Sequence, residues 1–174
     1  MKTKPIRPPA QSIEALLAAH GSDAAQARAG TRTLPIARES FVASLRAETT
    51  QAERPRLLEV LDVFLKWSLE RPTLVSFRDR ETRPDVVSFV RARSGEVLWS
   101  ARPRRGELPT LELVPRALRV LSEEDRLLAM QTLNAHTRET LTTGDALRIG
   151  FGALKNPDAR GAVLALLDRL IAAT

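Results

Sequence analysis

Residues 86–102, VVSFVRARSGEVLWSAR, decide the fold class. They form two runs rich in valine, phenylalanine and tryptophan, which are residue types common in strands, and Ser94-Gly95 separates the runs. A serine–glycine pair between two such runs is typical of a two-residue hairpin turn. We therefore expect antiparallel strands over 86–93 and 96–102, with Arg93 opposite Glu96.

This register assigns each side chain of the hairpin to a face, because side chains alternate along a strand. The face expected to be buried contains Ala92, Val97, Val90, Trp99, Ser88, Ala101 and Val86. The other face is expected to be basic and half apolar. It contains Arg91, Arg93, Arg102, Glu96 and Ser100 with Val87, Phe89 and Leu98, and the last three would be exposed unless another helix covers them.

The flanking sequence predicts further strands and two groups of helices. Short β-rich runs occupy 73–78 and 110–114. Helical spacing and start signals predict helices from Ser12, from Pro35, over 55–70, over 122–141, over 145–155 and from Asn156 onward. The predicted fold is α+β: N-terminal helices, a small antiparallel β-meander at about residues 73–114, and C-terminal helices packed on the sheet. The Trp99 face is expected to pack against the helices that begin near Pro55 and Asn156.

Length and composition favour one domain in a reducing compartment. The 174 residues match the size of a single domain, predicted over 12–174, and the proline-rich basic segment 1–11 is expected to be a flexible arm. No apolar run approaches the roughly 20 residues that span a bilayer, so neither secretion nor a membrane location is expected. Because the chain has no cysteine, disulfides and cysteine-ligated metals are excluded and a cytoplasmic location is predicted.

Positive charge is concentrated in the middle of the chain. The net charge is +6, and residues 71–119 hold 11 basic and 6 acidic side chains. Nearly all the basic residues are arginines, whose planar fork suits phosphate and carboxylate. A GC-rich genome produces the same bias, and both explanations stay open. The candidate nucleic-acid-binding residues are Arg91, Arg93, Arg102, Arg104 and Arg105.

Signatures of the common enzyme classes are missing from the sequence. His20 and His136 are far apart and have no cysteine partners, so no metal site and no cofactor are predicted. The glycines match neither the P-loop nor the dinucleotide-binding fingerprint, and no GxSxG or HExxH occurs. These observations favour a binding protein over an enzyme.

One short pattern resembles part of the PD-(D/E)xK nuclease motif. Pro84-Asp85 precedes one predicted strand, and Glu96-Val97-Leu98 opens the next. In that family two acids on adjacent strands hold a divalent cation, and a lysine lies two residues after the second acid. The resemblance implies a metal-dependent nuclease using Asp85 and Glu96, but Leu98 stands at the lysine position and cannot stabilise charge.

Two hypotheses therefore lead. The first is a non-enzymatic binding module whose basic sheet segment contacts nucleic acid or another polyanion. The alternative is a protein-interaction or assembly subunit that binds its partner through Val87, Phe89 and Leu98 on the half-apolar hairpin face. The degenerate nuclease is a remote third.

Overall fold

The computed structural model describes residues 11–24, 33–80, 82–137 and 147–173. The helices α1 (Ile13–Ala24), α2 (Leu34–Glu48) and α3 (Arg54–Leu69) come first, followed by the strands β1 (Val75–Phe77), β2 (Val87–Arg91), β3 (Val97–Arg104) and β4 (Glu107–Leu113). The elements α4 (Pro115–Leu118), α5 (Glu123–His136), β5 (Leu147–Gly150), α6 (Phe151–Leu154) and α7 (Pro157–Ala172) complete the order. The predicted α+β class, with helices before and after a meander, is confirmed. Residues 1–10 of the predicted arm lie outside the described residues.

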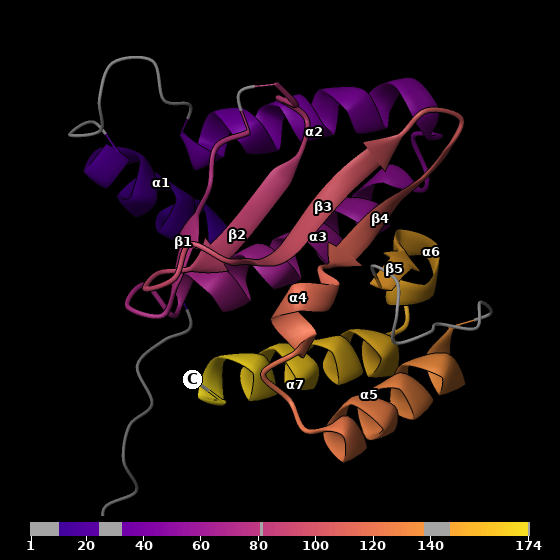
Figure 1. Cartoon of the computed structure of the whole chain (residues 1–174). Helices are drawn as coiled ribbons and strands as arrows, with labels where there is room; N and C mark the ends of the chain where they lie inside the picture. The colour runs from indigo at the N-terminus through magenta and orange to yellow at the C-terminus, as the bar shows by residue number, and fades with distance from the viewer. Residues whose placement is uncertain (1–10, 25–32, 81, 138–146, 174) are drawn as a thin grey trace, which may run out of the picture.

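The sheet is an antiparallel meander whose spatial order, β1-β2-β3-β4-β5, equals its order in sequence (Figure 1). One row of paired residues runs across it through Phe77, Phe89, Trp99, Leu113 and Leu147. The adjacent row contains Ser88, Ser100, Glu112 and Arg148. Since neighbouring rows point to opposite faces, one face of the sheet is apolar and the other is polar.

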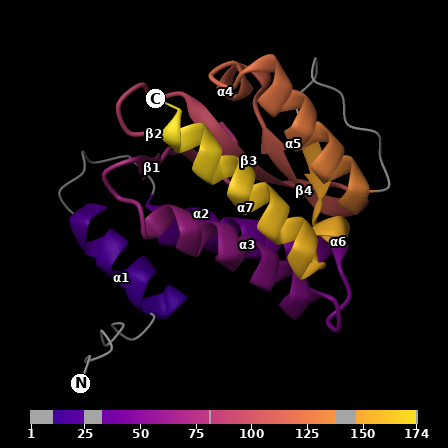
Figure 2. The same ribbon diagram turned by 90° about the horizontal axis from the view of Figure 1, so that it is seen from below.

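The helices of the described ranges cover the apolar face of the sheet and leave the polar face open. In Figure 1, α2 and α3 lie behind the sheet, and no described helix covers the face turned to the viewer. Figure 2 shows α7 running between α3 and α5. Trp99 is fully buried, donates a hydrogen bond from its indole nitrogen to Ser68 Oγ of α3 at 3.0 Å, and stacks on Phe89 with ring centroids 5.0 Å apart. The predicted packing of the Trp99 face on the helix that begins near Pro55 is confirmed.

Local start signals in the sequence place most of the helices correctly. Ser12 Oγ accepts the Ala15 N–H, Ser122 Oγ accepts the Asp125 N–H, and Asn156 Oδ1 accepts the Asp158 N–H, so each caps the helix that follows. Pro55 lies in the first turn of α3, where its missing N–H removes no helical bond. Among the described residues, no helix combines the length and apolar character needed to cross a membrane.

The predicted hairpin register is wrong by one residue. The Arg91 N–H donates to the Glu96 carbonyl and the Gly95 N–H donates to the Arg91 carbonyl, both at 2.9 Å, so four residues, 92–95, form the loop. Gly95 has a φ of +67°, which a residue without Cβ adopts at little cost. A register shift follows, because Val90 pairs with Val97 whereas Phe89 pairs with Trp99. Trp99 and Arg91 therefore lie on the same face of the sheet.

The predicted helix over 145–155 is also wrong. Residues 147–150 form β5, which pairs with β4 through Leu111 opposite Ile149 and Glu112 opposite Arg148. Only the four residues of α6 follow as a helix before Lys155. The predicted continuation of α5 to residue 141 and the break at 142–145 lie largely outside the described residues, and the described part of α5 ends at His136. The sheet thus gains a fifth strand that carries Arg148.

Candidate anion-binding face of the sheet

The open face of the sheet is polar yet largely buried at its centre. Ser88 and Ser100 are almost fully buried and share a hydrogen bond of 2.9 Å between their hydroxyls. Glu112, next to Ser100 in the same row, is only 8% exposed. No described helix lies on this side of the sheet (Figure 1).

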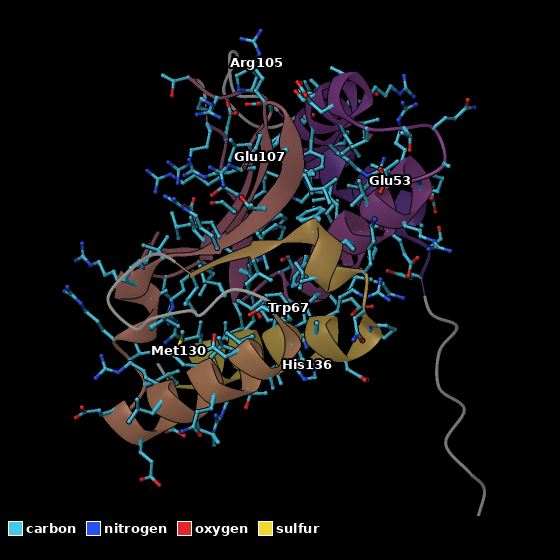
Figure 3. All side chains as sticks on the ribbon, turned by 90° about the vertical axis from the view of Figure 1, so that its right-hand side faces the viewer. Glu53, Trp67, Arg105, Glu107, Met130 and His136 are labelled. Atoms are coloured by element: carbon cyan, nitrogen blue, oxygen red, sulfur yellow. The ribbon has the colours of Figure 1, made fainter. Side chains whose placement is uncertain are left out.

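Arginines form the rim of a hollow at the end of this face near the β3–β4 turn. The hollow has a volume of about 410 Å³ and is lined by Arg83, Arg102, Pro103, Arg104, Arg105, Glu107, Thr110, Glu112 and Arg148. Its lining holds five guanidinium groups and two carboxylates. Figure 3, which views the sheet from its edge, shows Arg105 at the tip of the β3–β4 turn and nitrogen-tipped side chains along the open face. Positive charge therefore exceeds negative charge by three within one concavity.

Ion pairs position several of these guanidinium groups. Glu112 accepts contacts from two arginines on neighbouring strands: Arg102 Nε at 2.5 Å and Arg148 Nε at 2.9 Å. At the rim, Arg104 Nε lies 3.2 Å from Glu107. Arg105 makes no hydrogen bond or ion pair with any described residue. The lining of the hollow thus combines three arginines held by ion pairs, Arg102, Arg104 and Arg148, with Arg105, which has no such contact among the described residues.

A second hollow continues the positive surface toward the β2–β3 hairpin. It has a volume of about 490 Å³, and Arg78, Arg80 and Arg116 contribute to its lining. Burial lowers the pKa of the Arg80 guanidinium, the charges of Arg78 and Arg102 lower it further, and Glu112 raises it. Arg80 is therefore close to both hollows. We call the following set of residues the basic strip: Arg78, Arg80, Arg83, Arg102, Arg104, Arg105, Arg116 and Arg148.

The structure brings together three of the five predicted nucleic-acid-binding arginines. Arg102, Arg104 and Arg105 line the first hollow. The predicted face of Arg91 is wrong: the residue lies with Trp99 on the helix-covered face, is 6% exposed and donates from Nη2 to the Leu170 carbonyl of α7 at 2.9 Å. Arg93 is exposed in the hairpin loop, at the other end of β3 and roughly 23 Å from the turn at 3.3 Å per residue.

The three apolar hairpin residues considered as a partner-binding surface are buried. Val87, Phe89 and Leu98 are each at most 1% exposed and belong to the core cluster. The one-residue shift turns Val87 and Phe89 toward the helices, because a slip by one residue reverses the face of every side chain in a strand. These three side chains pack in the protein's own core, so they do not form a surface for a partner.

The two acids of the nuclease-like pattern are separated. Asp85 precedes β2 and Glu96 precedes β3, and these positions lie at opposite ends of an antiparallel pair. Each acid has its own cationic partner, with Arg83 3.6 Å from Asp85 and Arg116 3.6 Å from Glu96. Within the described ranges, no three histidine, aspartate or glutamate side chains form a group that could hold a metal ion.

Sequence reasoning missed Arg148, Arg80 and Glu112 as parts of this site. Arg148 lies in the range predicted as a helix, because the alternation in Leu147-Arg148-Ile149 is too short to indicate a strand by itself. Arg80 belongs to a charged run that is typical of a solvated loop. Glu112 gave no signal of its own, because its role depends on which residues lie opposite it in β3 and β5.

Comparisons of the chain with protein-family models, with curated proteins and with solved structures find no match. The interpretation of the basic strip rests on its own geometry and charge.

Proposed function

We propose that this protein is a non-enzymatic binding module whose basic strip contacts the phosphate groups of a nucleic acid. The observation that carries the proposal is the convergence of five arginines, from the β1–β2 connection, the β3–β4 region and β5, on one hollow that holds only two carboxylates. An anionic ligand would neutralise this excess. Arginine suits phosphate because its planar fork of N–H donors matches the oxygens of the anion.

The shape of the strip favours an extended polyanion over a single small ion. Two hollows lie along the open face, one near each end of β3, with Arg80 close to both. Eight residues of β3 span roughly 23 Å. A nucleic acid backbone supplies phosphates over such a length, and contacts to phosphates fix position without reading sequence.

The proposed contacts are with the backbone and not with stacked bases. The residues that line the two hollows include no aromatic side chain. Proteins that hold single strands generally stack bases on aromatic residues, so the strip suits a duplex better. Discrimination among base sequences should accordingly be small.

The other two hypotheses lose the features on which they rested. The assembly hypothesis depended on exposed Val87, Phe89 and Leu98, which are buried. The nuclease hypothesis depended on Asp85 and Glu96 meeting at one site, and these acids lie at opposite ends of the hairpin.

Salt dependence of duplex binding tests the proposal. We expect a 20-base-pair DNA duplex, followed by fluorescence anisotropy, to bind with a log–log salt slope of about −3 to −5, since each neutralised phosphate contributes about −0.9. The triple variant R104A/R105A/R148A removes three exposed arginines of the strip and should reduce the slope by about 2 to 3.

A matched triple variant separates location from net charge. Arg56, Arg93 and Arg119 are exposed and lie outside the first hollow, so R56A/R93A/R119A loses the same charge and should keep a slope close to that of the parent. Equal losses in the two triple variants, or no binding by the parent chain in 20 mM salt, would refute the proposed function.

A further inference from the structure

Glu112 occupies the middle of the basic strip, where a ligand anion would be expected. Its neighbours in the row are Ser100 on β3 and Arg148 on β5. The carboxylate is nearly enclosed, since the residue is 8% exposed. The other two carboxylates that line the hollows, Glu96 and Glu107, lie toward the two ends of the strip.

The carboxylate of Glu112 contacts one nitrogen of each of two arginines in the basic strip. Arg102 approaches one carboxylate oxygen and Arg148 approaches the other, through the Nε edge of each guanidinium. Burial, Arg78 and Arg102 lower the pKa of Arg80, and the charge of Glu112 opposes this lowering, so Glu112 also acts on a third cation. One internal carboxylate therefore partly neutralises three arginines of the strip.

We infer that Glu112 is an internal substitute for a ligand phosphate: it holds Arg102 and Arg148 in the free protein and competes with bound phosphate for them. The inference rests on the proposed function and concerns the regulation of affinity at the same site. A phosphate that enters the hollow draws one or both guanidinium groups away from the carboxylate, and the repulsion between Glu112 and the phosphate weakens binding. The negative charge of Glu112 then limits the affinity of the basic strip for phosphate.

A purely structural role for Glu112 makes the opposite prediction. Glutamine has nearly the same shape, and its carbonyl oxygen can still accept a hydrogen bond from Arg102 or Arg148. If the carboxylate only orders the arginines for binding, E112Q should bind duplex DNA more weakly, because the arginines lose their fixed positions. If the carboxylate competes with phosphate, E112Q should bind more tightly.

The test measures duplex binding by E112Q and by two control variants. At 0.1 M salt we expect E112Q to bind the 20-base-pair duplex about 8-fold more tightly, the factor for one additional phosphate contact, and its salt slope to steepen by about 0.9. E107Q removes an exposed rim carboxylate and should give a smaller gain. E39Q removes an exposed carboxylate from α2 and should change affinity less than 2-fold.

The outcomes separate this inference from the proposed function. Weaker or unchanged binding by folded E112Q, or an equal gain in E39Q, overturns the inference while leaving the function in place. Binding by E112Q but not by the parent chain supports the inference and overturns the function as stated. Absence of binding by both proteins overturns both.

A measurement on the parent protein covers the case in which E112Q fails to fold. In protein labelled with ¹³C at glutamate carboxyl carbons, the Glu112 resonance should shift as duplex DNA is added, because its arginine partners turn to phosphate. An unperturbed Glu112 resonance at saturating DNA contradicts the inference.

Discussion

The two faces of the sheet are buried by different means. On the helix-covered face, Phe89 and Trp99 stack and Phe64 of α3 lies against Trp99, with ring centroids 5.8 Å apart. On the open face, Ser88 and Ser100 are equally inaccessible but are covered without any described helix. Arginine side chains can cover such a surface, because their stems are apolar while their charged ends stay in water.

This difference separates stability from binding. The helix-covered face is stabilised by apolar burial, which is large and is not subject to screening of charges by salt. The open face is held by hydrogen bonds and ion pairs around Glu112, whose net contribution to stability is smaller because charges must be desolvated to form them. Substitutions on the first face should therefore change the free energy of unfolding, and substitutions of the exposed arginines on the second face should mainly change ligand affinity.

The strongest test of this separation is Trp99→Ala. Removal of a fully buried indole from the helix-covered face should lower the free energy of unfolding by about 3–5 kcal/mol, measured by urea denaturation. The exposed Arg105→Ala on the strip should change it by less than about 0.5 kcal/mol. Similar destabilisation by the two variants would contradict the distinction between the faces.

A second test uses Arg91, which lies on the helix-covered face and not on the proposed binding face. Arg91→Ala removes the hydrogen bond to the Leu170 carbonyl and the contact of Nε with Glu96 at 3.9 Å. A buried hydrogen bond from a charged group typically contributes about 1.5–3 kcal/mol, so we expect a stability loss of about 2–3 kcal/mol. The salt slope for duplex binding should stay unchanged.

Arg93→Ala is the matched control for this experiment, since Arg93 is exposed in the adjacent loop. Its effect on stability should be below about 0.5 kcal/mol. A change in salt slope in the Arg91 variant, with stability preserved, would return Arg91 to the set of ligand-binding residues.

The smallest expected effect concerns the serine pair on the open face. Ser88→Ala and Ser100→Ala each leave one buried hydroxyl without its partner, and each should lower the free energy of unfolding by about 1–2 kcal/mol. In the double variant neither hydroxyl remains. Its loss should therefore be smaller than the sum of the single losses by about 1 kcal/mol in a double-mutant cycle. Additive losses would mean that the hydrogen bond between the two hydroxyls contributes little to the free energy of unfolding.

Sequence patterns that act locally predicted most of the fold. The caps at Ser12, Ser122 and Asn156, and the proline at the start of α3, depend only on residues a few positions away. The helices before and after the meander follow from such signals and from apolar spacing. These elements are confirmed because tertiary contacts agree with the local preference.

The register of the hairpin could not be read from its turn residues. Ser94-Gly95 fits a two-residue turn, but the loop has four residues and Leu98 adds an irregularity to β3. Packing of Phe89 and Val87 against the helices favours the observed register, and that preference depends on contacts far away in the sequence. The face of Arg102 is nevertheless predicted correctly. Arg102 and Trp99 are three residues apart in β3, so their side chains point to opposite faces of the sheet in either register.

The candidate site was only partly predictable because it is assembled across strands. Arg102, Arg104 and Arg105 stand close together in the sequence and were found. Arg148 lies 36 positions after Glu112, and only the pairing of β4 with β5 makes them neighbours. Four residues of strand are too few for periodicity to distinguish them from a helix.

The contacts of α7 have a consequence for the order in which the protein forms during synthesis. Asp168 accepts a hydrogen bond from the indole of Trp67, which precedes it by 101 residues, and Leu170 accepts one from Arg91, which precedes it by 79. The strands β1 to β4 pair with their sequence neighbours and can associate early, because the short connections between them close at little entropic cost. The ribosome, however, delivers residues 168–170 long after these strands. Until then Arg91 and Trp67 lack the hydrogen-bond acceptors that Leu170 and Asp168 provide. The core is therefore completed only when α7 has been synthesised and packs.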